Sequence, residues 1–269
     1  MKLKYRKIIA KYKPIHLMAR WIMYNNGIFV YRKIYKQYNL GEKLTKLKGC
    51  GSGKRCFIIG NGPSLKTSDL DKLVNEDCFA ANEIYKIFDS TKWRPKFFLI
   101  KDRYSKTSGE KVDQLEVGTV FLSDYYLRYH DVKRTDIICL HERYALNEMK
   151  IPFSDNIERC FYSAATVTYG LMQIAMYLGY MEVYLIGFDH DYSFEFDKVG
   201  NVVRTGTENT HFFDDEIPED IIANVFGMTK AYEAFKRYAD EHGIIVRNAT
   251  HGGRLEVFER VNLDSILSN

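Results

Sequence analysis

Short apolar runs alternate with polar segments along most of this chain. The first clear run, Cys56–Ile59, leads directly into Gly60-Asn61-Gly62-Pro63-Ser64. An uninterrupted apolar run bounded by glycine is typical of a buried strand in a parallel sheet. Similar runs predict strands over residues 77–83, 96–102, 119–123, 136–140, 182–189 and 244–246. We therefore expect most of the chain to form one sheet with its connections.

The segments between these runs predict helices. Apolar residues recur with helical spacing over residues 162–180, where Gly179 provides a stop. A short helix is predicted over residues 67–74 and a long one over residues 218–241. The polar residues 190–217 predict a long loop of functional importance. Strands that alternate with helices predict an α/β, Rossmann-like fold, with a mostly parallel sheet covered by helices on both faces.

Polar residues stand at the ends of the predicted strands. The corner Gly60–Ser64 ends the first strand, and Asn82, Asp102, Asp189 and Asn248 follow others. Ligands of such sheets bind outside the carboxyl ends of the strands, so we expect these residues to converge on one cleft. The corner's two glycines allow a sharp turn, and the N-terminus of a following helix suits a phosphate. The alternative is an ordinary strand-to-helix turn, because the corner is neither a Walker A loop nor a complete G-x-G-x-x-G fingerprint.

Composition places the chain among globular proteins. The chain is 46% hydrophobic and 28% charged, and its 269 residues are enough for one large α/β domain or for one domain plus an appendage. The five cysteines are dispersed without C-x-x-C spacing, which favours reduced thiols and a cytoplasmic location. No signal peptide is evident, and no apolar run approaches the ~18 residues of a membrane-spanning helix.

Charge divides the chain into two regions. Residues 1–54 contain fourteen Lys and Arg against the single acid Glu42, a net +13, and the overall charge of +4 then puts the rest at −9. We expect residues 1–53 to be a basic helical arm with a Gly-rich flexible linker, and residues 54–269 to be the catalytic domain. Basic residues interleaved with aromatic ones over residues 1–48 favour attachment to an anionic membrane surface, such as the inner face of the cell membrane. The alternative is an arm that packs on the domain or on a second subunit; no nucleic acid partner is expected.

Three blocks of the sequence resemble the bacterial sialyltransferases of glycosyltransferase family 42. They are Ile58-Ile59-Gly60-Asn61-Gly62-Pro63-Ser64-Leu65-Lys66, then Ala81-Asn82-Glu83, and the run from Leu178 to Asp189. The ending Arg247-Asn248-Ala249-Thr250-His251-Gly252-Gly253 looks more like the wider family of archaeal 6-hydroxymethyl-dihydropterin pyrophosphokinases (MptE-like), which also includes flagellin-glycosylating nonulosonate transferases. The resemblance covers roughly residues 55–262 and leaves the basic arm unexplained.

The resemblance implies a GT-A variant of the Rossmann fold that binds a CMP-sugar without a metal. Carried over, Asn61 and Ser64 would contact the phosphate or ribose, Asn82 the cytidine or phosphate, and Tyr192 the leaving phosphate. The substrate-binding residues expected in this way are Gly60, Asn61, Gly62, Ser64, Asn82, Glu83, Thr166, Thr168, Asp189 and Tyr192. The family's catalytic histidine lies in a His-x-x-x-His stretch. Here His211 matches the first histidine and Asp215 stands in place of the second, so the general base is either His211 or Asp215.

The resemblance implies an inverting transfer of a sugar, sialic acid or a related nonulosonate, from a CMP-activated donor to a surface-glycan acceptor. A base would deprotonate the acceptor hydroxyl while hydrogen bonds hold the leaving phosphate. No cofactor is favoured, but Asp189-His190-Asp191 leaves an alternative, because an Asp-x-Asp pair can hold Mg²⁺ on a nucleotide diphosphate. That alternative implies a UDP- or GDP-sugar transferase or a pterin pyrophosphokinase. A non-catalytic glycan- or nucleotide-binding protein and a homo-oligomer also stay open.

Overall fold

The structure is a computed structural model, and it describes residues 14, 15, 18, 22, 40–102, 105–145, 147, 149–192, 194–196, 202–204 and 224–268. Most of the basic arm therefore lies outside the described residues, as do His211 and Asp215. Among the described helices, none combines the length and the apolar composition needed to cross a bilayer.

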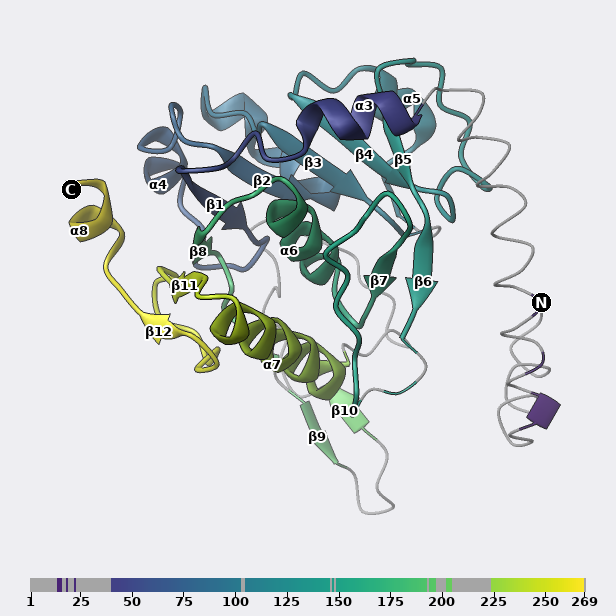
Figure 1. Cartoon of the computed structure of the whole chain (residues 1–269). Helices are drawn as coiled ribbons and strands as arrows, with labels where there is room; N and C mark the ends of the chain where they lie inside the picture. Colours follow the sequence, from purple (N-terminus) through teal and green to yellow (C-terminus); the bar gives the residue numbers. More distant parts are fainter. Residues whose placement is uncertain are drawn as a thin grey trace.

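An eight-stranded sheet runs through the centre of the molecule (Figure 1). The strands lie in the order β12 (Glu259–Arg260), β11 (Ile245–Asn248), β8 (Glu182–Ile186), β1 (Arg55–Ile59), β2 (Cys78–Ala81), β3 (Phe97–Ile100), β4 (Thr119–Ser123) and β5 (Ile138–Leu140). Every neighbouring pair in this sheet is parallel. The predicted α/β, Rossmann-like fold is confirmed.

The strand order reverses beside β1. From β1 the chain moves outward to β5 on one side, and it then returns to β8 and moves outward to β12 on the other. The loops that leave β1 and β8 therefore diverge toward opposite faces of the sheet and open a crevice at their carboxyl ends. This is the place where a doubly wound sheet binds its ligand.

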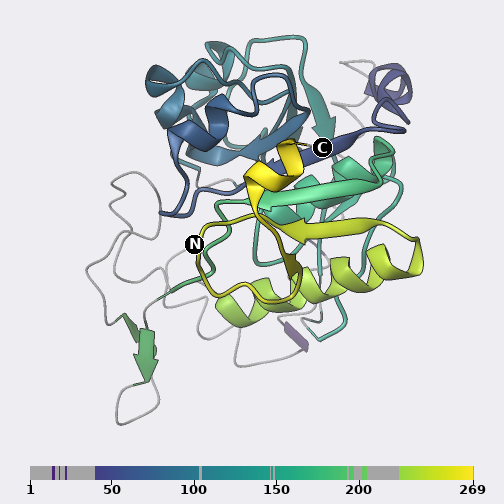
Figure 2. The same cartoon turned by 90° about the vertical axis from the view of Figure 1, so that its left-hand side faces the viewer.

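Helices cover both faces of the sheet, because alternate residues of each strand point to opposite sides. On one face, α3 (Leu40–Leu47), α6 (Thr168–Tyr177) and α7 (Val225–Glu241) pack over a core that includes Ile58, Phe79 and Leu99. On the other face lie α4 (Thr67–Asp71), the 3-10 helix η1 (Asn82–Ser90), α5 (Gly109–Asp113) and α8 (Leu263–Leu267). Figure 2 shows the yellow-green α7 and the blue helical segments on opposite sides of the strands.

Several predicted boundaries are wrong, because the strands and helices are mostly shorter than the patterns predict. The predicted strand 77–83 ends at Ala81, and the predicted helix 162–180 begins only at Thr168. The residues before it form β7 (Phe161–Ser163), which pairs with β6 (Glu142–Tyr144). The Gln173 side chain, reaching from α6, accepts from the Tyr162 N–H at 2.8 Å and donates to the Tyr162 carbonyl at 2.9 Å, so an extended segment is stabilised there.

The beginning of α7 also differs from the prediction. This helix begins at Val225 instead of near residue 218, because the Asn224 side chain accepts a hydrogen bond from the Gly227 N–H and caps the first turn. Pro218 itself lies outside the described residues. The predicted loop 190–217 contains a hairpin of β9 (Phe194–Phe196) and β10 (Val202–Arg204). Gly179 follows α6 with a φ of 90°, which confirms the predicted stop.

Residues 40–53 pack against the sheet domain. Leu44 of α3 is fully buried in the core, and the Gly51 N–H donates to the Leu178 carbonyl at 2.7 Å. A Cβ on Gly51 would lie 2.4 Å from the Tyr180 ring, so glycine is needed there for close contact. The glycines that predict a flexible linker thus include one that allows a tight turn to approach an aromatic side chain.

We predict that Leu44→Ala lowers the free energy of unfolding by about 2–5 kcal/mol, because it leaves a cavity beneath α3. Urea denaturation of the full chain measures the change. The neighbouring Lys46→Ala, on the exposed side of α3, should alter the unfolding free energy by less than about 1 kcal/mol. Equal, small effects of both substitutions would show that α3 is not part of the cooperative folding unit.

Candidate functional site

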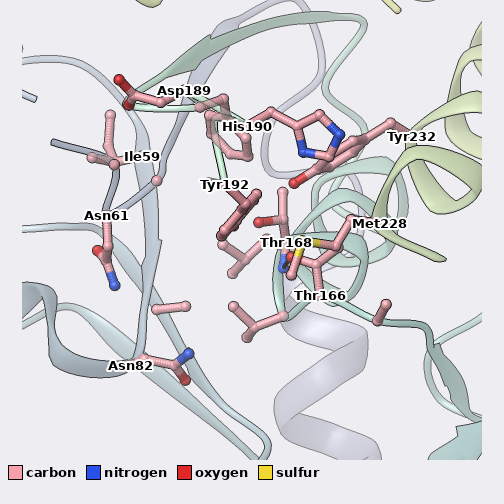
Figure 3. Close-up of a pocket in the computed structure, with 18 of the residues that line it drawn as sticks. Ile59, Asn61, Asn82, Thr166, Thr168, Asp189, His190, Tyr192, Met228 and Tyr232 are labelled. Atoms are coloured by element: carbon pink, nitrogen blue, oxygen red, sulfur yellow. Dashed lines mark hydrogen bonds between the residues drawn. The ribbon is translucent and has the colours of Figure 1, made fainter. Parts of the chain in front are cut away.

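A cavity of about 260 Å³ lies at the carboxyl ends of the central strands. The ends of β1, β2, β3 and β8, the N-terminus of α6 and part of α7 enclose it (Figure 3). Of the residues predicted from the sequence, the structure brings nine to its lining: Gly60, Asn61, Gly62, Asn82, Asp102, Thr166, Thr168, Asp189 and Tyr192. The strand ends therefore converge on one hollow.

Three of the predicted residues that the structure describes do not line the cavity. Asn248 is fully buried at the end of β11, where its side chain donates to the Leu255 carbonyl at 3.0 Å. Ser64 lies behind the corner, where it contacts Asp189. Glu83 belongs to η1 and is mostly buried, with its carboxylate 3.5 Å from the Lys86 ammonium. His211 and Asp215 lie outside the described residues, so their role as the base stays a prediction.

The Asp189 carboxylate closes the glycine corner. The Ser64 N–H donates to Asp189 Oδ1 at 3.2 Å, and the Ser64 hydroxyl donates to Oδ2 at 2.9 Å. A Cβ on Gly62 would lie 1.9 Å from Asp189 Oδ2, so only glycine allows this approach. The N–H groups of Gly60 and Gly62 donate to the carbonyls of Ile186 and Gly187. The corner's N–H groups at 60, 62 and 64 are thus bonded within the protein.

Two asparagines that line the cavity have buried side-chain oxygens. Asn61 and Asn82 lie along one side of it in Figure 3. Their Oδ1 atoms are inaccessible to solvent and have no hydrogen-bond partner within the described part of the chain. Asn82 also has a φ of 54°, a left-handed conformation that is strained for a residue with a side chain. An N–H or O–H group of a ligand would satisfy both oxygens.

Another part of the lining is formed by residues 165–168 at the N-terminus of α6, where the Thr168 N–H donates to Thr166 Oγ1 at 3.2 Å and the Gly170 N–H donates to the Val167 carbonyl at 2.9 Å. Lys101, directly after β3, is the single lysine or arginine among the described residues of the lining. Sequence reasoning missed Lys101, because the residue lies within a predicted strand and belongs to no motif.

Aromatic rings form the third side. The His190 ring lies 6.0 Å from the Tyr192 ring and 5.6 Å from the Tyr232 ring, and His190 has a φ of 51°. Burial lowers the pKa of His190 and raises the pKa of Tyr192 and Tyr232, so each favours its neutral form. Of these three, only Tyr192 was predicted. Tyr232 comes from α7, far along the sequence, and no spacing pattern links it to the strand ends.

The carboxylates of Asp189 and Asp191 do not fit a preformed metal site. Asp189 accepts hydrogen bonds from Ser64 on both oxygens, and Asp191 pairs with Arg254 at 3.2 Å. Across the described residues, no three His, Cys, Asp or Glu side chains gather closely enough to hold a metal ion. The two aspartates act here as structural anchors for the loops around the cavity.

Comparisons with known proteins give one family and one solved structure. The family model described as 6-hydroxymethylpterin diphosphokinase MptE-like matches residues 30–195. The MAf glycosyltransferase from Magnetospirillum magneticum AMB-1 is 17% identical with a TM-score of 0.48, over 82% of this chain and 38% of that one. This chain therefore spans less than half the length of that protein. Among curated proteins, none matches.

We predict that Asp189 makes stability depend on pH. Burial raises the pKa of its carboxyl above 3.8, although hydrogen bonds from Ser64 oppose the shift. Because the folded state holds this proton more tightly than the unfolded state does, protonation of Asp189 favours folding. This contribution to the free energy of unfolding is complete below the unfolded pKa and is lost as the pH rises through the folded pKa. The free energy of unfolding of the wild type, relative to Asp189→Asn, should fall over that window. Urea denaturation at a series of pH values measures it, and a rising difference would contradict the assignment. Ser64→Ala should extend the window to higher pH.

Proposed function

This chain belongs to the 6-hydroxymethylpterin diphosphokinase MptE-like family, and we propose that it is a transferase whose cavity binds an activated nucleotide. One observation carries the proposal. Two buried asparagine oxygens without partners among the described residues lie in the same hollow as Lys101 and the N-terminus of α6. A nucleotide has the matching chemistry, because its base and ribose carry N–H and O–H donors and its phosphate carries negative charge.

The donor is proposed to lie across the cavity. Its nucleoside would donate to Asn61 and Asn82, while its phosphate would face Lys101 and the beginning of α6. The glycine corner offers little to a phosphate, because its N–H groups at 60, 62 and 64 already bond to Asp189 and to backbone carbonyls. The corner instead fixes the position of Asn61.

The reaction that we propose is glycosyl transfer from a CMP-activated donor, sialic acid or a related nonulosonate, to a hydroxyl of a glycan acceptor. The acceptor oxygen attacks the anomeric carbon with inversion, its proton passes to His211 or Asp215, and the CMP phosphate leaves. A leaving monophosphate needs hydrogen bonds and positive charge, which Lys101, α6 and the Tyr192 hydroxyl can supply. The engaged state of Asp189 and Asp191 supports a route in which neither residue holds a metal.

The family's own description favours a second candidate, the transfer of a diphosphate group from ATP to a pterin. Such chemistry uses Mg²⁺ held largely by the phosphates, with one or two carboxylates from the protein. The aromatic side of the cavity, with Tyr192 and Tyr232, would suit a flat pterin ring. Residues 1–48 are proposed to hold either enzyme at an anionic membrane surface.

An assay with CMP-sialic acid distinguishes the two candidates. We predict that the protein releases CMP from this donor equally well with and without EDTA, since no metal takes part in departure of the phosphate. Mg²⁺-dependent conversion of ATP to AMP in the presence of 6-hydroxymethylpterin, with no release of CMP, would support diphosphate transfer. In the first case Asn61→Ala should weaken CMP binding about 3–10-fold, through loss of a hydrogen bond. Asn75→Ala, on an exposed turn, is the matched control.

The predicted base has its own test. His211→Ala should lower the turnover number by about 10²–10⁴-fold, because the acceptor proton loses its destination. The CMP dissociation constant should stay within about twofold, since the base faces the acceptor. Asp215→Ala separates the two candidate residues in the same assay. Full activity in both variants would remove both residues from this role.

A further inference from the structure

Lys101 has an unusual environment for a lysine in a cavity. Its side chain is only 12% exposed, and its ammonium forms a long ion pair with the buried Glu142 carboxylate. The ammonium donates to the Ser163 hydroxyl at 3.0 Å, and the nearest carboxylate oxygen, Glu142 Oε1, lies 4.0 Å away. An ammonium carries three N–H groups, so Ser163 uses one of them and leaves others for a ligand.

Glu142 is a buried acid next to this ammonium. Its side chain is 3% exposed, and its Oε2 has no hydrogen-bond partner within the described residues. The Asp124 carboxylate accepts the Glu142 backbone N–H at 2.9 Å, and this bond fixes the beginning of β6. Burial raises the pKa of the Glu142 carboxyl, while the Lys101 ammonium opposes the shift. An isolated buried charge is costly, so the Lys101 ammonium and the Glu142 carboxylate each offset part of the cost of burying the other.

Secondary structure sets the distance between them. Lys101 follows β3 of the large sheet, whereas Glu142 and Ser163 sit on β6 and β7 of the small one. The Ser123 hydroxyl, at the end of β4, donates to the Lys101 carbonyl at 2.7 Å and holds its backbone. The lysine is therefore fixed at its backbone and at its ammonium before any ligand binds.

We propose that Lys101 binds the phosphate of the nucleotide, and that Ser163 and Glu142 are positioning residues that hold its ammonium toward the cavity. This inference rests on the proposed function and deepens it. When the bond between the anomeric carbon and the phosphate oxygen breaks, its electron pair stays on that oxygen. The acceptor oxygen forms the new bond to carbon and gives its proton to the base. Lys101 stabilises the charge that the leaving phosphate gains.

Comparing CMP with cytidine isolates this role, because the two differ only by the phosphate. Isothermal titration calorimetry on the full chain should show that the wild type binds CMP more tightly than cytidine. Lys101→Met keeps the length of the side chain and removes the charge. It should weaken CMP binding ~10–100-fold, the loss of a charged hydrogen bond, and leave cytidine binding unchanged. Lys101→Arg should restore part of the CMP affinity, and Lys92→Met, at an exposed site outside the cavity, should change neither affinity.

The roles of Ser163 and Glu142 are tested by the ratio of the dissociation constants for cytidine and CMP. Ser163→Ala and Glu142→Gln should each lower the preference for CMP over cytidine by several-fold, whereas a purely structural defect would weaken both ligands together. An unchanged CMP preference in Lys101→Met and Ser163→Ala, with a wild type that prefers CMP, would overturn this inference and leave the proposed function standing. A wild type that binds neither compound would overturn both.

Discussion

The hydrogen bonds between Ser64 and the Asp189 carboxylate are the constraint on which the site depends. They join the end of β1 to the end of β8 at the point where the strand order reverses. A third segment meets them there, because the Arg254 N–H donates to the Asp189 carbonyl at 2.6 Å. A Cβ on Gly253 would lie 2.5 Å from that carbonyl oxygen, so glycine is required on this side as well. Asp189 thus holds together three loops that are distant in sequence, and Asn61 lies in the loop that follows β1.

The same carboxylate decides where negative charge can bind. Two unit charges about 4 Å apart repel by about 4 kcal/mol at an effective dielectric constant near 20. A phosphate at the glycine corner would meet that repulsion, and the corner has used its N–H groups at 60, 62 and 64 on internal acceptors. Lys101 is the cation of the described lining, and it stands there beside Asp102 and the beginning of α6.

The sequence predicts the parts of this arrangement that follow from strand order. Asn61, Asn82 and Asp189 were expected to meet because the carboxyl ends of parallel strands share one edge, and the structure places them together. Lys101 gave no signal, because its role depends on Ser163 and Glu142, which reach it from a two-stranded sheet that the apolar pattern did not reveal. Tyr232 is likewise invisible in sequence, because an aromatic residue on an amphipathic helix is most often part of the core. Gly51 shows the opposite error, a prediction that the structure does not support. The glycine-rich pattern predicts flexibility there, whereas Gly51 is needed for close packing against Tyr180.

Strain and unsatisfied polarity coincide at this cavity. Asn82 and His190 are the two non-glycine residues with positive φ in the described structure, and both line it. Each such conformation costs about 1–3 kcal/mol and persists only where surrounding contacts hold it. The His190 ring is held by Thr229 at 2.8 Å, and the Asn82 backbone by its place between β2 and η1. The Oδ1 atoms of Asn61 and Asn82 add a further cost, because each is desolvated without a hydrogen bond from the described residues. A ligand with donor groups removes that cost on binding. Because the two oxygens are already dehydrated in the free protein, the ligand gains their hydrogen bonds without a further cost of dehydrating them.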